Sequence, residues 1–396
     1  MRKSDFQSIA AKNRTVLNIM GALIQSRNVL VLGHKNSDED CIASMVAISL
    51  LVKKLNRNVS ILLTEQIHER FLYLLNICRY NAINIIPDCS GIINEIDTIC
   101  VVDTPKPTML QSCQGAEKLL HSSAVKVIEF DHHLAADSAY IAPQETALVA
   151  TASSTCELIG YLALKIRCLR DLFEGIDVDD IFSRNFVLAV LTGIVGDSKM
   201  GKFIKNHRER WFYELFSSWF SRLLSEKTHR TSSNLSSMEE IFKEITRLSK
   251  LEERCFKFFM QHKQNAKCIS YIILDRSQTS PLPKDTDMDL FVSTARSVTD
   301  ALAEMSGCLG MVAYYDPPEV SDLIQFRIRR SHSFEGFDLR EILTAADIDN
   351  GGGHEGAIGF RIPASRIPDI QEFCRKLLEI IDDLLASPSR TPREKS

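Results

Sequence analysis

The chain has 396 residues, and at roughly 150 residues per domain this length predicts two or three domains. Hydrophobic residues make up 45% of the sequence and charged residues 25%, which is ordinary for a globular protein that builds its own cores. The formal net charge of −4 excludes a strong global basic field, so a nucleic-acid partner would have to be short or bound locally.

The first half of the chain alternates between two kinds of apolar pattern. Helical spacing from 5 to 26 predicts an amphipathic helix, and the short apolar run 28–33 predicts a strand. Further strands are expected at 58–63, 82–86, 98–102 and 125–130, and further helices at 43–55, 154–166 and 183–195, the last with a short extended segment at its end. This alternation predicts an α/β fold whose sheet is mainly parallel and flanked by helices.

The pattern changes between 205 and 265. Charged and aromatic residues dominate there, and the Ser/Thr-rich stretch 228–237 has no strand signal and is expected to be flexible. We interpret this segment as a helical linker or insert whose aromatic face packs on a neighbour. The aromatic residues are Trp211, Phe212, Tyr213, Phe216, Trp219 and Phe220.

A second, smaller α/β unit follows, with a helix expected at 290–305. Its strands are expected at 269–274, 309–315 and 323–328. We therefore predict domains at 1–204 and 266–386, joined by the linker 205–265, with an active-site cleft between the domains. The polar tail 387–396 is expected to be disordered.

Cysteine usage and hydropathy bear on the compartment. Eleven cysteines without a C-x-x-C motif favour neither a disulfide framework nor a zinc finger, so we expect reduced thiols. No secretory h-region follows the N-terminus, and no stretch approaches the roughly 18 apolar residues of a membrane span. These features predict a cytoplasmic protein that does not bind membranes.

Histidine and aspartate side chains follow several of the predicted strands. In an open parallel sheet ligands bind at the carboxyl ends of the strands, so a cluster of such residues there predicts a metal site. Imidazole with several carboxylates suits Mn²⁺, Fe²⁺ or Mg²⁺, and the lack of cysteine ligands disfavours structural zinc. The candidate residues are His34, Asp38, Asp40, Asp103, Asp131, His132, His133 and Asp197.

This set offers more ligands than one octahedral ion needs. This number of ligands suits a pair of ions about 3.5–4 Å apart, bridged by one carboxylate. Such a pair would activate a water molecule for attack on phosphorus and stabilise the charge that develops on the phosphoryl oxygens.

The order of the motifs resembles the DHH phosphoesterase family. The matching segments are Gly33-His34-x-x-x-Asp38-x-Asp40, Val102-Asp103-Thr104, Asp131-His132-His133, Ser153-Ser154-Thr155-Cys156-Glu157 and Gly193-Ile194-Val195-Gly196-Asp197-Ser198. The family usually reads Pro-Asp-Gly-Asp-Ala where this chain has Ser37-Asp38-Glu39-Asp40-Cys41, a departure that removes no ligand. We expect Glu39 to face solvent and Cys41 to be a small packing residue.

The resemblance also implies roles for the residues of domain 1–204, which would be catalytic. His34 and Asp38 would bind the first metal ion, Asp40, His132 and Asp197 the second, and Asp103 would bridge the two. Asp131 would orient the histidine pair, as bound imidazoles usually require, and His133 would face the substrate phosphate. No protein side chain would act as nucleophile.

A second resemblance concerns the C-terminal domain that accompanies the family's oligonucleotide and small-nucleotide enzymes. Gly351-Gly352-Gly353-His354 resembles its signature, and consecutive glycines let backbone N–H groups approach a phosphate while His354 adds a donor. Alternation along the preceding basic strand puts Arg327 and Arg329 on one face. The resemblance implies that Arg329 is the phosphate-binding arginine, with Arg330 as the alternative if the register shifts by one residue.

Together these features predict a hydrolase with two Mn²⁺ ions, with Mg²⁺ or Fe²⁺ as alternatives. Its expected substrates are short oligoribonucleotides, linear dinucleotides or 3′,5′-bisphosphate nucleotides such as pAp. The first alternative is a cyclic-dinucleotide (c-di-AMP) phosphodiesterase, and an alternative of another class is a catalytically degenerate nucleotide-binding sensor. The helical insert could mediate formation of a homodimer.

Overall fold

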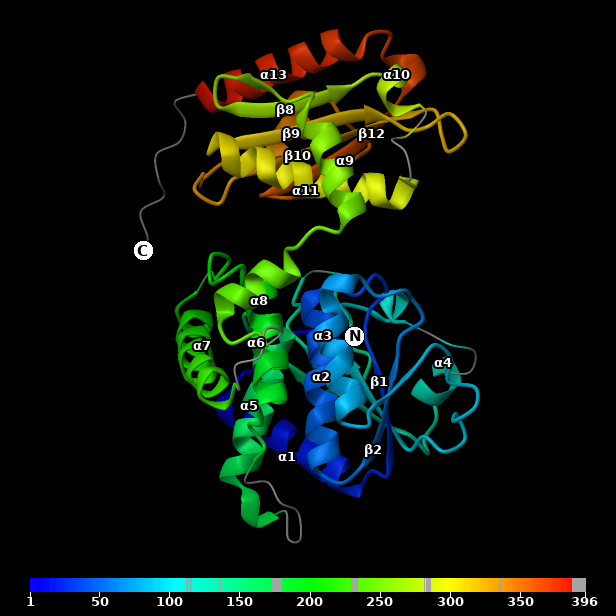
Figure 1. The fold of residues 1–396 in the computed structure, drawn as a ribbon, viewed down its shortest axis with the longest axis vertical. Coiled ribbons are helices and arrows are strands. Elements are labelled where there is room, and N and C mark those ends of the chain that lie inside the picture. Colours follow the sequence, from blue (N-terminus) through cyan, green and yellow to red (C-terminus); the bar gives the residue numbers. More distant parts are fainter. Residues whose placement is uncertain are drawn as a thin grey trace. The chain divides into compact units, whose positions relative to one another are not determined.

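The computed structural model describes residues 1–111, 113, 116–135, 137–172, 180–204, 206–228, 234–280, 282, 286–334 and 336–386. The contacts divide the chain into two compact units, Met1–Arg247 and Leu248–Ser396 (Figure 1). None of the described helices combines the length and the apolar character that crossing a bilayer requires. The predicted tail 387–396 and the centre of the Ser/Thr-rich stretch lie outside the described residues.

The first unit contains a six-stranded sheet in the order β3-β2-β1-β4-β5-β6, and all its strand pairs are parallel. This confirms the predicted mainly parallel α/β sheet. The strand expected at 82–86 begins two residues late, because Ala82 has a left-handed φ of 51°. The strands are β1 (Asn28–Leu32), β2 (Asn58–Leu62), β3 (Asn84–Ile86), β4 (Thr98–Val102), β5 (Lys126–Asp131) and β6 (Ala147–Val149).

Helices cover one face of this sheet and a smaller apolar cluster covers the other. Val29 and Val31 of β1 pack into the cluster shared with the large helices, whereas Leu30 and Leu32 point into the opposite cluster, as strand alternation requires. The helices are α1 (Ile9–Gln25), α2 (Glu39–Lys54), α3 (Leu72–Tyr80), α4 (Ala116–Leu120), α5 (Thr155–Cys168), α6 (Arg184–Ser198), α7 (His207–Lys227) and α8 (Met238–Ile245). Short 3₁₀ turns lie at Glu69–Phe71, Pro107–Met109, Gln144–Thr146 and Arg170–Leu172.

The residues expected to form a separate linker are shared between the two units. On α7, Phe216 and Phe220 are fully buried in the core of the first unit, so the aromatic face does pack on a neighbour. By contrast, α9 (Lys250–Met260) buries Cys255 and Phe259 in the second unit. The boundary in the structure therefore follows Arg247, because each helix belongs to the core that covers its apolar face.

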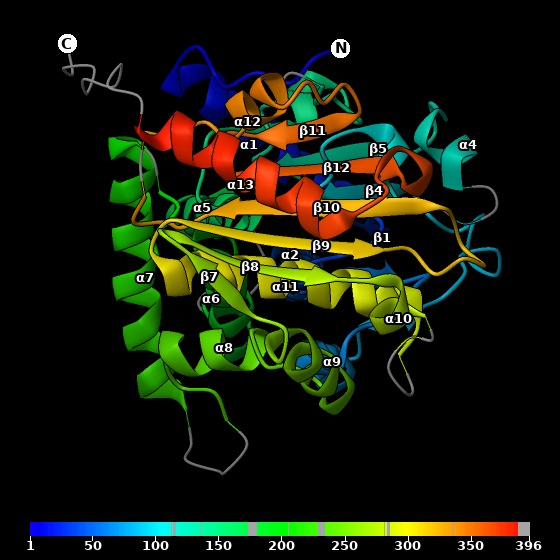
Figure 2. The same cartoon turned by 90° about the horizontal axis from the view of Figure 1, so that it is seen from above.

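The second unit is a mixed sheet between two layers of helix (Figure 2). Its strand order is β11-β12-β10-β9-β8-β7, and the pair β8–β9 is parallel. Helix α13 packs on one face and α11 on the other. The elements are β7 (Gln264–Ala266), β8 (Ile269–Leu274), α10 (Arg276–Thr279), α11 (Met288–Ser306), β9 (Leu309–Tyr315), β10 (Leu323–Arg330), α12 (Arg340–Ala345), β11 (Gly351–His354), β12 (Ala357–Pro363), a 3₁₀ turn at Ala364–Arg366 and α13 (Ile370–Ala386).

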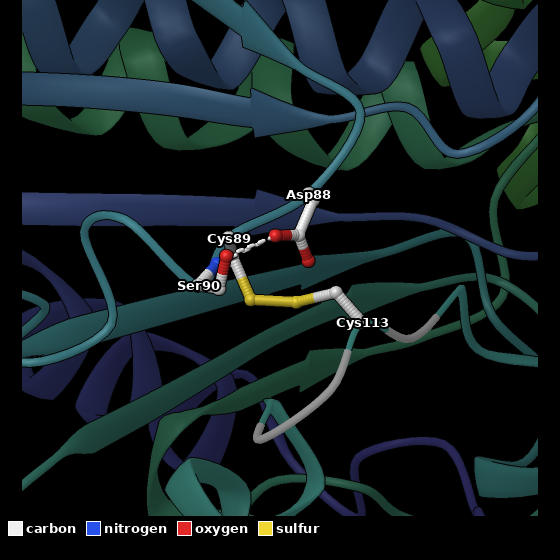
Figure 3. The surroundings of a disulfide bond; sticks show 4 residues. All are labelled: Asp88, Cys89, Ser90 and Cys113. Atoms are coloured by element: carbon white, nitrogen blue, oxygen red, sulfur yellow. Dashed lines mark hydrogen bonds between the residues drawn. A yellow bond between two sulfur atoms is a disulfide. The ribbon is translucent and has the colours of Figure 1, made fainter.

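One pair of cysteines corrects the expectation that every thiol is reduced. Cys89 and Cys113 form a disulfide in the first unit, as Figure 3 shows, whereas the other nine cysteines are free. Their Cα atoms lie 6.1 Å apart, a separation that a disulfide spans readily. The 24-residue spacing carries no motif, so only the folded chain reveals this pair.

Candidate metal centre

The loops that follow three adjacent strands meet at one edge of the parallel sheet. Because β1, β4 and β5 are neighbours in the sheet, the residues after their carboxyl ends lie side by side. His34 follows β1, Asp103 follows β4, and His132 follows β5. Asp40 comes from the first turn of α2.

Asp197 reaches the same place from a helix and not from an extended segment. It lies in the last turn of α6, which continues without a break to Ser198 and ends at Lys199 in a left-handed conformation. The expected extended end of this element is therefore wrong. A fully apolar run cannot be assigned to helix or strand from its periodicity alone, and here the helix continues.

The first group of candidate ligands surrounds the imidazole of His34. Its Nε2 lies 3.6 Å from Asp38 Oδ1 and 3.7 Å from Asp103 Oδ2. The carboxylate of Asp38 also caps helix α2 by accepting a hydrogen bond from the backbone N–H of Cys41 at 3.1 Å. The cap fixes where this carboxylate points.

The second group surrounds the imidazole of His132. Its Nε2 lies 3.0 Å from Asp197 Oδ2 and 3.6 Å from Asp103 Oδ1. Potential ligand atoms of Asp40, His132 and Asp197 all lie within 4.8 Å of one another. Asp103 therefore faces His34 with one oxygen and His132 with the other, which is the arrangement of a bridging carboxylate.

The tautomers of the two histidines fit metal binding. His34 Nδ1 lies 2.8 Å from the carbonyl oxygen of Lys35, and His132 Nδ1 lies 3.2 Å from that of Ala152. A carbonyl only accepts, so each Nδ1 carries a proton, and in the neutral ring each Nε2 then has a free lone pair for a metal ion. The buried Nε2 of His132 faces the Asp197 carboxylate at 3.0 Å without a well-aligned hydrogen bond, and a cation between the two would satisfy both groups.

Buried negative charge points to the same conclusion. Asp40 is fully buried and accepts backbone N–H groups of Thr155 at 2.6 Å and Cys156 at 3.1 Å at the start of α5. Burial, together with the carboxylates of Asp103 and Asp197, raises the pKa of Asp40 well above its usual value. Without a cation these carboxylates repel one another, so the residues present fit a pair of divalent ions.

The shared negative charge also changes the pKa values around His34. Burial lowers the pKa of His34, but its contacts with Asp103 and Asp38 outweigh burial and raise it overall. Burial raises the pKa of Asp38, yet the contact with His34 brings it down to about 2. The raised pKa of His34 and the lowered pKa of Asp38 both indicate that the surroundings favour a positive charge between the carboxylates.

Asp131 contacts only one of the two histidines that follow it. Its Oδ1 lies 2.7 Å from Nδ1 of His133, whereas His132 is oriented by the carbonyl of Ala152. The side chain of His133 is 37% exposed, so it is accessible to a ligand beside the buried carboxylates. Its Nδ1 also lies 3.6 Å from Asp103 Oδ1.

Two further polar residues support the centre, and one of them carries no signal in the sequence. Lys3 is buried and places its Nζ 2.5 Å from Asp131 Oδ2 and 2.7 Å from Glu129 Oε1. Thr155, which belongs to one of the quoted motifs, donates its hydroxyl to Asp103 Oδ1 at 2.9 Å. An isolated lysine near the N-terminus matches no motif, so its position is visible only in the folded chain.

Two neighbours of the ligands differ from expectation. Cys41, expected only to pack, has its sulfur grouped with His34 and Asp103, although burial raises the pKa of its thiol to about 11 and keeps it neutral. Glu39, expected to face solvent, has a side chain only 13% exposed and pairs with Lys199 at 2.8 Å. The carboxylate turns inward because Gly196 leaves room for it beside α6.

The predicted phosphate-binding residues lie on neighbouring strands of the second unit. Arg329 of β10 is opposite Ala357 of β12, which is opposite His354 of β11. Arg329 Nε pairs with Asp300 at 3.1 Å, and the side chain of His354 is outside the description.

The glycines Gly351, Gly352 and Gly353 form the edge strand β11, where they line a cavity of about 540 Å³. At Gly353 φ is 143°, and a Cβ would lie 2.0 Å from the carbonyl oxygen of Ala357. Only glycine fits this position.

Comparison with known proteins identifies a family and a similar curated protein. Residues 28–194 match the DHH family, N-terminal domain. The cyclic-di-AMP phosphodiesterase PdeA of Listeria monocytogenes serotype 1/2a (strain 10403S) is 30% identical over 183 residues, which are 45% of this chain and 26% of that protein. The match thus spans about a quarter of that relative's length.

Among solved structures, an exopolyphosphatase-related protein from Bacteroides fragilis has a TM-score of 0.62 and 16% identity. The alignment covers 94% of this chain and 95% of that one. At this identity the likeness shows a common fold.

Proposed function

We propose that the chain, whose residues 28–194 match the DHH family, N-terminal domain, is a metal-dependent phosphodiesterase. Its proposed substrates are short oligoribonucleotides, linear dinucleotides and 3′,5′-bisphosphate nucleotides such as pAp. We further propose that it works in the cytoplasm and uses two Mn²⁺ ions, with Mg²⁺ or Fe²⁺ as alternatives.

The observation that carries this proposal is the pair of ligand groups that share Asp103. His34 and Asp38 would hold one ion on one side of Asp103, and Asp40, His132 and Asp197 would hold the other. When bound, such a pair supplies an activated water molecule and a positive field for the developing charge on a phosphoryl group.

The protein's own residues position this chemistry. The backbone at the start of α5 fixes Asp40, and the hydroxyl of Thr155 fixes Asp103. The Asp131 carboxylate orients the exposed imidazole of His133, which is proposed to contact a non-bridging oxygen of the substrate. In the second unit we propose that Arg329, His354 and the glycine strand β11 bind a terminal phosphate.

A second candidate activity is hydrolysis of a cyclic dinucleotide. The observation that favours it is the 30% identity to the L. monocytogenes cyclic-di-AMP phosphodiesterase. A two-metal centre of this kind would act on a linear or a cyclic phosphodiester, so substrate comparison has to separate the two.

Product analysis of the purified, Mn²⁺-loaded protein tests the proposal. The substrates are pApA, a five-nucleotide RNA, pAp and cyclic di-AMP. We expect release of mononucleotide from the linear substrates and a loss of at least about a hundredfold in His132→Ala, because a direct ligand matters no less than the residues that orient it. The matched control is His207→Ala, which removes an exposed histidine at the start of α7.

Each outcome has a distinct meaning. Faster opening of cyclic di-AMP than of pApA would replace the first candidate by the second. No turnover of any substrate by a protein that binds metal would contradict both and favour a nucleotide-binding sensor.

A further inference from the structure

A cavity of about 750 Å³ lies in the first unit beside the metal centre. Small-molecule sites usually measure roughly 300–1,000 Å³, so this cavity has the size of a ligand site. Its walls are largely apolar and include Leu110, Leu120 and Ile141. Lys35, which immediately follows the candidate ligand His34, forms part of its rim.

The wall of this cavity is fixed to the loop that carries His34. His34 and Leu110 form an isolated backbone bridge, and the N–H of Lys35 donates to the carbonyl of Met109 at 2.7 Å. The N–H of Gln111 donates to the carbonyl of Gly33 at 2.8 Å. The cavity wall and the metal-binding loop therefore form one hydrogen-bonded piece of structure.

The disulfide anchors the same wall from its other side. Cys113 lies two residues beyond Gln111, and its bond to Cys89 joins this segment to the end of β3 (Figure 3). A wall that is bonded on both sides is shaped before a ligand arrives, which lowers the entropic cost of binding.

The charged side chains around the cavity are of one sign. Lys35 and Lys118 line it beside the imidazole of His121, and neither lysine has an ion-pair partner among the described residues. The described lining residues include no aspartate or glutamate. An anionic group on the ligand would therefore meet unneutralised positive charge.

Tyr140 offers a flat apolar surface within the same cavity. Its hydroxyl accepts the N–H of Ser4 at 3.3 Å and donates to the carbonyl of Ser4 at 3.1 Å, so the tip of the ring is held. An aromatic ring with a fixed orientation is a surface on which a nucleobase stacks at little entropic cost.

We propose that this cavity is a nucleotide subsite that takes one nucleoside monophosphate unit. The base lies against Tyr140 and the apolar walls, and the phosphate faces Lys35 and Lys118. The cavity's own chemistry calls for an anionic aromatic ligand, and the choice of a nucleotide rests on the proposed function. The subsite would hold a nucleotide of the substrate or product next to the metal centre.

Calorimetric titration of AMP into the metal-free full-length protein tests this proposal. We expect AMP to bind at least about tenfold more tightly than ribose 5-phosphate, which lacks the base. Tyr140→Ala should weaken AMP binding roughly five- to a hundredfold, the range that base stacking on an aromatic ring gives. Tyr140→Phe, which keeps the ring and loses only the bonds to Ser4, should bind AMP nearly as tightly as the unmodified chain.

Reversing a charge in the cavity gives a second test that does not depend on Tyr140. Lys118→Glu should weaken AMP binding by roughly three- to tenfold, because it replaces attraction by repulsion at an accessible site. Lys126→Glu is the matched control, since Lys126 begins β5 at the opposite edge of the sheet.

Three results would overturn the proposal: no AMP binding, equal binding of AMP and ribose 5-phosphate, or full binding in both Tyr140→Ala and Lys118→Glu. Binding that is lost in Arg329→Ala but kept in Tyr140→Ala would place the nucleotide in the second unit and also overturn it. The titration needs no metal and no turnover. AMP binding can therefore be found even if the protein hydrolyses no phosphodiester, and hydrolysis can be found even if AMP does not bind in this cavity.

Discussion

Lys3 is the single buried cation that the described residues place against two carboxylates behind the metal centre. Its ammonium contacts Glu129, Asp131 and the carbonyl of Thr104 at 2.5–2.7 Å, and all three charged side chains are fully buried. Removing one partner of a buried ion pair leaves the other charge without compensation. Since Asp131 in turn holds His133, Lys3 acts on the centre through a chain of two contacts.

Replacing this lysine should therefore cost stability. We expect Lys3→Met to lower the free energy of unfolding by roughly 3–5 kcal/mol, measured by urea denaturation. The matched control is Lys106→Met, whose partner Asp137 is 69% exposed, and there we expect less than about 1 kcal/mol. Equal losses in the two variants would show that the buried triad contributes no more than a surface pair.

Some residues of the centre can be predicted from the sequence and others cannot. The candidate ligands lie in short motifs directly after apolar runs, so their clustering could be predicted from the order of elements in an open sheet. Lys3 lies about a hundred residues from its partners, and the Cys89–Cys113 bond joins two segments without a motif. Contacts of that kind depend on the packing of the whole unit.

At the scale of elements, the start of helix α5 contains a buried acid. Ser154 caps the helix, and the carboxylate of Glu157 accepts the N–H of Ser153 at 3.0 Å and its hydroxyl at 2.5 Å. Burial raises the pKa of Glu157 from 4.5 to about 7 and outweighs these hydrogen bonds. The folded helix therefore favours the protonated acid.

This pKa shift predicts how stability depends on pH. The folded pKa is raised, so the stabilisation is complete below about pH 4.5 and is lost as the pH rises through about 7. Glu157→Gln cannot ionise, so its free energy of unfolding relative to the unmodified chain should rise by up to about 3 kcal/mol over that interval. Unfolding titrations at several pH values measure this difference, and a difference that stays constant with pH would contradict the assignment.

The observed ends of the strands and helices show which sequence patterns were sufficient to predict an element's boundaries. The strands β4, β8 and β9 begin and end where β-rich runs between polar residues predict them. The end of α6 was misread because all residues but Thr192 are apolar or glycine over the two turns before Asp197, a pattern with no helical or strand period. For α7 the aromatic spacing indicated a helix, but not which core would bury it.

At the scale of the whole molecule, the alternation of strands and helices was enough to predict two α/β units. It was not enough to assign 205–265, because amphipathic helices between two cores can join either one. The structure assigns α7 and α8 to the first core and α9 to the second. The first unit gathers buried carboxylates from three separate elements, and that concentration of negative charge favours the binding of cations.

Titration of metal-free protein with Mn²⁺ tests the two-ion centre most directly. We expect two ions per chain, and in Asp103→Asn the loss of at least one of them, because Asp103 is the carboxylate that both ligand groups share. Asp137→Asn, which alters an exposed carboxylate, is the matched control and should keep both ions. A single ion per chain in the unmodified protein, or two ions bound unchanged by Asp103→Asn, would contradict the bridged centre.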